Sequence, residues 1–188
     1  APLRVDTLRP SAVVGHEALA RFSGRVPTGR WFRAAALHDL GTELERQTLR
    51  LALAKLLTLP EREFLAINAS PAAVHDEEIL RLLLEVDLTR VVVEITEHDA
   101  VNDYGETRRV LADLRRRGAR IAVDDVGAGF ASLRHVLLLQ PDLIKLDWAL
   151  TRDVHNNATQ AAIVRSVVGF ADEVGAGPER SGVPRHTP

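Results

Sequence analysis

Four short apolar runs in this sequence each lead to side chains that carry oxygen atoms. The runs begin at Val13, Phe64, Val91 and Ile121, and the residues that follow them are Glu17, Asn68, Glu94 and the pair Asp124–Asp125. Continuous apolar runs of this length are typical of parallel strands that are covered on both faces. Packing alone does not explain why an oxygen ligand recurs at the end of each run. The pattern therefore predicts a hard-cation site at one rim of a parallel sheet.

Helical patterns alternate with these runs. Apolar spacing predicts helices over 43–57, after a cap at Asp76, around 110–114 before Gly118, and around 164–171, and a further strand over 143–147. Strands that alternate with helices indicate βα units and a parallel sheet. Ligands at the ends of several strands favour a TIM-like (β/α) barrel. An open doubly wound sheet would more often carry a glycine-rich phosphate loop after its first strand, and none follows Val13.

Composition narrows the class of partner. The chain has 188 residues with 24 basic and 26 acidic side chains, a net charge of -2, and no cysteine. This balance gives no electrostatic case for binding a nucleic-acid polymer. The absence of cysteine excludes disulfides and thiolate chemistry. No apolar run approaches the roughly 20 residues of a membrane helix.

The domain prediction divides the chain near its C-terminal end. We expect one partial barrel domain over 1–175 and an unstructured tail over 176–188, which is rich in glycine and proline. About six strands precede the tail, whereas a closed barrel needs eight. The last strands are therefore expected to be missing. An unclosed barrel exposes strand edges, which favours dimers or exchanged elements.

Five motifs in order resemble the EAL family of cyclic di-GMP phosphodiesterases. They are Glu17-Ala-Leu19 followed by Arg21, Asn68 to Pro71, Glu94 to Glu97, Asp124 to Leu133, and Pro141 to Asp147. The resemblance implies a modified TIM barrel that hydrolyses cyclic di-GMP to linear pGpG with Mg²⁺ or Mn²⁺ at a two-metal site. It also implies a cytoplasmic location, a homodimer and a parent protein with sensory or GGDEF-type domains.

The resemblance also assigns roles to individual residues. Metal ligands would be Glu17, Asn68, Glu94 and Asp124, with Asp125 holding a second metal. Catalytic residues would be Lys145, which would contact the attacking water, together with Glu97 and Asp125. Arg21 would bind a substrate phosphate, and Leu19 and Asp147 would complete the substrate site. Paired divalent ions about 3.5–4 Å apart suit phosphodiester hydrolysis, because they activate water and neutralise the phosphoryl oxygens.

Two other functions stay open from the sequence. The family's glutamate-bearing and glutamine-bearing strands after the last helix have no counterpart here, and Val126 stands where the family has an aromatic residue. A degenerate domain that binds cyclic di-GMP or a protein without turnover is therefore the alternative. A different metal-dependent barrel enzyme with Lys145 as a base is a third hypothesis. Taken singly, Asp124–Asp125 could also be a solvated turn, and Lys145 a lysine with a buried stem.

Overall fold

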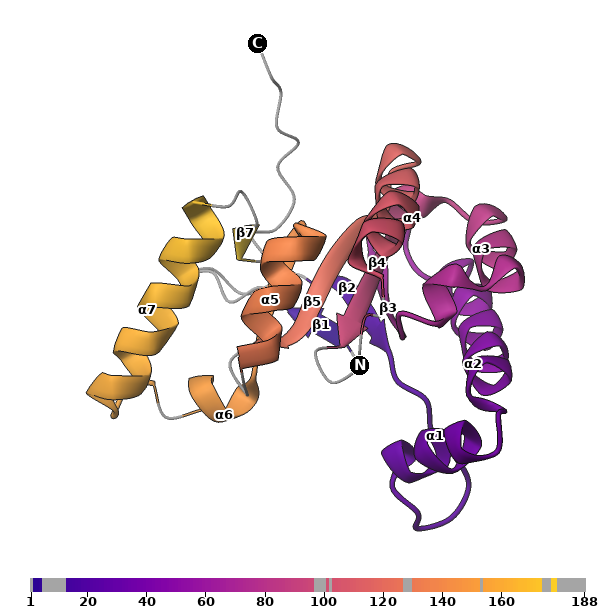
Figure 1. Ribbon diagram of the computed structural model, residues 1–188, viewed down its shortest axis with the longest axis horizontal. Coiled ribbons are helices and arrows are strands. Elements are labelled where there is room, and N and C mark those ends of the chain that lie inside the picture. Colours follow the sequence, from indigo (N-terminus) through magenta and orange to yellow (C-terminus); the bar gives the residue numbers. More distant parts are fainter. Residues whose placement is uncertain are drawn as a thin grey trace.

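The sheet keeps its strands in the order of the sequence. The computed structural model describes residues 2–4, 13–96, 101, 103–126, 130–152, 154–173 and 177–178. Within these residues one sheet contains seven strands: β1 (Pro2–Arg4), β2 (Val13–Ala18), β3 (Phe64–Ala69), β4 (Val91–Thr96), β5 (Arg120–Val126), β6 (Leu143–Leu146) and β7 (Gly177–Pro178). Figure 1 shows β2 to β5 near the centre of the molecule and β7 to one side of them. Every neighbouring pair from β2 to β7 is parallel, whereas β1 is antiparallel to β2.

Helices connect the parallel strands. They are α1 (Thr28–Leu37), α2 (Gly41–Leu56), α3 (Glu77–Leu84), α4 (Tyr104–Arg116), α5 (Phe130–Leu139), α6 (Trp148–Thr151) and α7 (Ala158–Glu173), with 3-10 turns at Ala73–His75 and Leu88–Arg90. In Figure 1, α2, α3 and α4 lie on one side of the strands and α7 lies at the other end. Asp76 caps α3 through the amide of Ile79, as the sequence predicts. The predicted stop at Gly118 is also present, because this glycine follows α4 with a positive φ of 104°.

The main core lies between the helices and alternate residues of the strands. On the strands it includes Leu65, Ile67, Val91, Val93, Ile95, Ile121, Val123 and Ile144, and on the helices Leu49, Leu53, Ile79, Leu83, Leu111, Leu114, Val136, Leu139 and Ala171. Successive strand residues point to opposite faces, so one set packs on the helices. The other set is then left to line the opposite face.

Buried apolar side chains form a floor on the face of the sheet opposite the helices. Phe64, Ala66, Val92 and Ala122 form a separate buried cluster there. Gly15 lies against the ring of Phe64, and a Cβ at Gly15 would come within 2.7 Å of that ring. This apolar floor lies one layer below the oxygen-bearing residues of the same strands.

The predicted alternation of strands and helices around a parallel sheet is confirmed. The pattern did not reveal the antiparallel direction of β1, the helices α5 and α6, or the short β7 strand inside 176–188. Residues 179–188 of the predicted tail lie outside the described part of the chain. Among the residues that are described, no helix has both the length and the apolar character needed to cross a membrane.

Candidate metal centre

Strand register brings the oxygen-bearing side chains to one face of the sheet. Glu17 on β2 is paired with Ala66 on β3, and Asn68 on β3 is paired with Glu94 on β4. Glu94 is in turn paired with Ala122 on β5. Residues paired across neighbouring strands point to the same face. The alanines carry only methyl groups, so they leave space beside the two glutamates.

A bulge in β5 separates Asp124 from the core residue that follows the acidic pair. The pairing of β5 with β6 shifts register between Val123 and Val126, which leaves one extra residue on β5. Asp125 absorbs it with a positive φ of 56°, a left-handed conformation that aspartate tolerates better than most residues. Asp124 lies two residues after Ala122 and so points to the carboxylate side, and the extra residue returns Val126 to the core. The Asp124 side chain accepts a hydrogen bond from the amide of Asp125 at 2.9 Å.

Lys145 lies among three carboxylates. Its Nζ atom is 2.8 Å from Glu94 Oε2, 3.2 Å from Asp124 Oδ2 and 3.6 Å from Glu17 Oε1. Ligand atoms of the same three acidic residues all lie within 4.8 Å of one another. The Asn68 amide nitrogen donates a hydrogen bond to Glu17 Oε1 at 3.4 Å. The amide oxygen of Asn68 can therefore serve as a metal ligand. The structure thus brings together four predicted metal ligands and the predicted catalytic lysine.

Burial controls the charge state of this cluster. The side chain of Glu94 is only 1% exposed, and its burial raises the pKa of the carboxyl to about 7, against the opposing effect of the Lys145 ammonium. Burial of Lys145 disfavours its charge, but Glu94, Asp124 and Glu17 together raise the pKa of Lys145 above its ordinary value. Lys145 is therefore a permanent cation at neutral pH.

The donor set fits a hard divalent cation. Carboxylate and amide oxygens are the ligands that Mg²⁺, Mn²⁺ and Ca²⁺ prefer. Oxygens that bind one such ion at about 2.1–2.5 Å lie at most about 4–5 Å apart, and the three carboxylates meet that spacing. With all three ionised, the Lys145 ammonium leaves two negative charges, which match one divalent ion.

Glu45 supports the loop that follows Asn68. The Ser70 amide donates to Glu45 Oε1 at 2.9 Å, and the Ser70 hydroxyl donates to Glu45 Oε2 at 2.5 Å. Ser70 also accepts a hydrogen bond from the amide of Ala73. One carboxylate on α2 thereby fixes the turn two residues beyond a ligand. Sequence reasoning did not assign this role, and the serine in the Asn68–Pro71 motif was its only signal.

Other predicted site residues lie apart from the cluster or outside the described residues. Arg21 is exposed, and its Nη1 atom donates to the neighbouring Ala20 carbonyl at 2.8 Å. Leu19 is also exposed. Asp147 caps α6 through the amide of Ala149. Asp125 is exposed beside the bulge. Glu97 lies outside the described residues.

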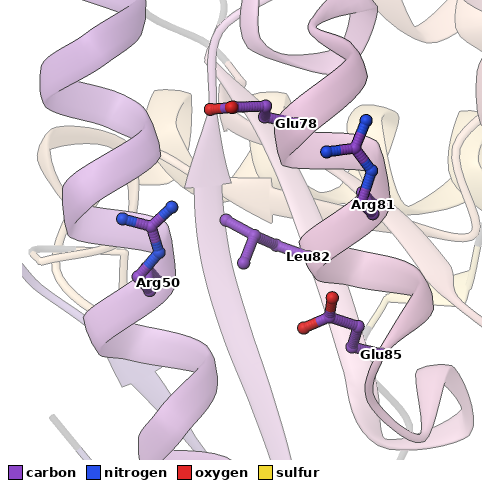
Figure 2. A pocket seen from close by; sticks show the side chains of 5 residues that line it. All are labelled: Arg50, Glu78, Arg81, Leu82 and Glu85. Atoms are coloured by element: carbon purple, nitrogen blue, oxygen red, sulfur yellow. The ribbon is translucent and has the colours of Figure 1, made fainter.

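A charged pocket on the helical side does not belong to this centre. Figure 2 shows Arg50 on α2 facing Glu78, Arg81, Leu82 and Glu85 on and just after α3. Its two guanidinium groups are balanced by two carboxylates, and all four charged residues are exposed. The helices α2 and α3 pack on the face of the sheet that lies opposite Glu94. The pocket is therefore a solvated surface feature.

Comparison with known proteins identifies the family. The EAL domain family matches residues 2–183 of the chain. The chain belongs to the EAL family. Among relatives of this EAL domain, a cyclic di-GMP phosphodiesterase of Pseudomonas aeruginosa is 31% identical over 185 residues, which are 92% of this chain and 32% of the relative. The family predicted from the five motifs is confirmed.

Solved structures share the fold. BlrP1 of Klebsiella pneumoniae, in a complex with calcium and cyclic di-GMP, matches with a TM-score of 0.74 and 32% identity over 87% of this chain and 43% of BlrP1. YkuI of Bacillus subtilis, in a complex with cyclic di-GMP and calcium, matches with a TM-score of 0.69 and 28% identity over 87% of this chain and 43% of YkuI. These matches confirm the predicted TIM-like α/β fold of EAL type. The chain spans less than half the length of each of these relatives.

Proposed function

We propose that this EAL domain hydrolyses one phosphodiester bond of cyclic di-GMP to give linear pGpG, with Mg²⁺ or Mn²⁺ as the metal. The observation that carries the proposal is the cluster of Glu17, Glu94 and Asp124 around Lys145, whose ligand atoms lie within 4.8 Å of one another. Support comes from the relative named as a cyclic di-GMP phosphodiesterase. BlrP1 adds support, because it was also solved with manganese and cyclic di-GMP.

The chain's own residues supply the framework of the reaction. Glu17, Asn68, Glu94 and Asp124 would hold the ion, and Asp125, which is exposed beside the bulge, is the residue proposed for a second one. The bound metal would activate a water molecule and offset charge on the phosphoryl oxygens. Water attacks phosphorus, one ester P–O bond breaks, and the products are a phosphomonoester and a free hydroxyl group. Lys145 is placed to orient the water or to offset the developing charge.

A turnover assay with a matched pair of variants tests this function. Glu94→Gln removes the most buried ligand charge at nearly constant shape, and Glu78→Gln makes the same change on the exposed surface of α3. With Mn²⁺ we expect Glu94→Gln to lower the rate of pGpG formation by about 10²-fold or more, and Glu78→Gln to leave it unchanged. Wild-type protein that binds cyclic di-GMP and forms no pGpG would instead support a sensor.

Assembly and context are parts of the same proposal. We propose a homodimer, because exposed apolar side chains such as Leu137 and Trp148 lie on successive helices of one end of the fold. Light scattering would show the mass of the particle. The greater length of the relatives supports a parent protein with sensory or GGDEF-type domains. We also propose that the domain works in the cytoplasm.

A further inference from the structure

The lysine of the candidate centre contacts every carboxylate of that centre. Lys145 Nζ lies 2.8 Å, 3.2 Å and 3.6 Å from oxygens of Glu94, Asp124 and Glu17, the three residues whose ligand atoms cluster within 4.8 Å. An ammonium group in this position contacts the same three carboxylates that would bind a divalent ion. The Lys145 ammonium group and a divalent ion bound to the same carboxylates would repel each other at such short range. The ammonium therefore competes with the metal for the carboxylates.

The choice of lysine at this position stands out in the chain. Of 24 basic residues, only Lys55 and Lys145 are lysines, and all the others are arginines. A guanidinium group is a planar fork that binds carboxylates in pairs, whereas an ammonium group is a compact charge on a flexible four-carbon stem. A compact charge can contact three converging carboxylates, and its flexible stem allows it to leave them.

The strand that carries Lys145 leaves the side chain able to move. Lys145 lies opposite the bulge, between the paired residues Ile144 and Leu146. Its side chain is 23% exposed, whereas that of Glu94 is 1% exposed. Burial and strand pairing hold Glu94 in place, whereas part of the Lys145 side chain is open to solvent.

We propose that Lys145 is the resident counter-cation of the metal-free centre and that a divalent ion binds by displacing its ammonium group from Glu94, Asp124 and Glu17. Lys145 then sets the concentration of divalent ion at which the centre fills. Below that concentration the lysine offsets part of the negative charge of the acidic cluster and stabilises the fold. The inference rests on the metal site of the proposed function, but it does not depend on hydrolysis.

Metal affinity in a pair of lysine variants tests the displacement. Lys145→Met keeps an unbranched side chain that is one atom shorter and carries no charge, and Lys55→Met makes the same change at an exposed position near the end of α2. By calorimetry we expect Lys145→Met to bind Mn²⁺ about tenfold more tightly than wild type, and to melt at a lower temperature in the presence of a chelator. Lys55→Met should match wild type in both. Equal or weaker Mn²⁺ binding by Lys145→Met would overturn the proposal.

A measurement on the wild-type chain covers the case in which Lys145→Met does not fold. Because the chain has two lysines, NMR of ¹³C-labelled lysine reports each Cε group separately. Titration with Mg²⁺ should shift the Lys145 signal with the same saturation that calorimetry with Mg²⁺ gives, and leave the Lys55 signal unchanged. An unmoved Lys145 signal at saturating Mg²⁺ contradicts displacement. Displacement without pGpG formation would contradict hydrolysis alone, and no metal binding in either protein would overturn both proposals.

Discussion

Asp76 joins two helices on the outer side of the sheet through a single carboxylate. It accepts a hydrogen bond from the amide of Ile79 at the start of α3. It also pairs with Arg46 on α2, with the Nη2 to Oδ2 distance at 2.9 Å and the Nε to Oδ1 distance at 3.3 Å. The hydrogen bond from Arg46 is the main reason that the pKa of Asp76 lies below its ordinary value.

Substitution of Asp76 should therefore have a pH-dependent cost. Asp76→Asn keeps an N-cap side chain but removes the charge, so we expect a loss of about 1 kcal/mol in unfolding free energy near neutral pH. A carboxyl with a lowered folded-state pKa stabilises the fold above its unfolded value of about 3.9, and this contribution disappears as the pH falls through the folded value. Urea unfolding should show the difference between wild type and variant shrinking below about pH 4.

The control for Asp76→Asn is Asp76→Ala, which also removes the cap and should cost about 1 kcal/mol more. That additional loss should persist in acid. The asparagine side chain can accept a hydrogen bond from the Ile79 amide at any pH, whereas alanine cannot. A difference between wild type and Asp76→Asn that stays constant from neutral to acid pH would show that the Arg46 pair contributes nothing through charge.

At the scale of elements, the turn that ends α4 requires glycine at position 118. Gly118 has a φ of 104°, and a Cβ there would lie 2.7 Å from Thr89 Cγ2 and 3.3 Å from the Thr89 backbone. Gly24 has a similar φ of 100° with nothing within 4 Å. Both glycines have a positive φ that other residues adopt at a cost, but only at Gly118 would an added Cβ collide with a neighbouring residue.

Alanine at these two positions should separate backbone strain from crowding. We expect Gly24→Ala to lower the unfolding free energy by about 1 kcal/mol, and Gly118→Ala to lower it by roughly 2–4 kcal/mol because the turn must also move away from Thr89. Thr89→Ser keeps the hydroxyl that bonds Asp87 and should recover part of the loss in Gly118→Ala. Equal losses at the two glycines, measured by urea unfolding, would contradict this steric account.

The elements that sequence predicts well are those with a clear period or a cap. Asp76 and Gly118 mark helix ends by their chemistry, and both predictions are confirmed. The helix α5 was not predicted, because the apolar run at its C-terminal end has no gaps that reveal a helical face. The antiparallel direction of β1 depends on pairing with β2, which local pattern does not encode.

At the scale of the whole molecule, the acidic centre links metal binding to the stability of the sheet. Glu17, Asn68, Glu94 and Asp124 come from four neighbouring strands, so an ion that binds them ties those strands together. With Mn²⁺ at 100 times its dissociation constant, we expect a gain of about 2.7 kcal/mol and a rise in melting temperature of roughly 5–10 °C. Differential scanning calorimetry with and without a chelator measures this rise. Glu94→Gln should lose most of it, and an equal rise in that variant would exclude the centre as its source.

The membership of the centre could be predicted from sequence, whereas its geometry could not. Strand ends locate Glu17, Asn68, Glu94 and Asp124 at one rim, because parallel strands share the direction of their carboxyl ends. The position of Lys145 among all three carboxylates depends on the register of β5 against β6. The role of Glu45 depends on α2 packing beside β3. Both are long-range relations that a local motif does not contain.

The bulge at Asp125 has a consequence for how this domain tolerates change. Because side chains alternate along a strand, the single inserted residue is what lets Asp124 and Val126 face opposite sides of the sheet. If the strand ran straight through this position with every residue kept, Val126 would turn toward the acidic rim, whereas deletion of Asp125 would leave Val126 on the core side next to Asp124. The centre therefore depends on the left-handed backbone at Asp125 as much as on side-chain chemistry, and a residue that resists that conformation would do more harm there than at most exposed positions.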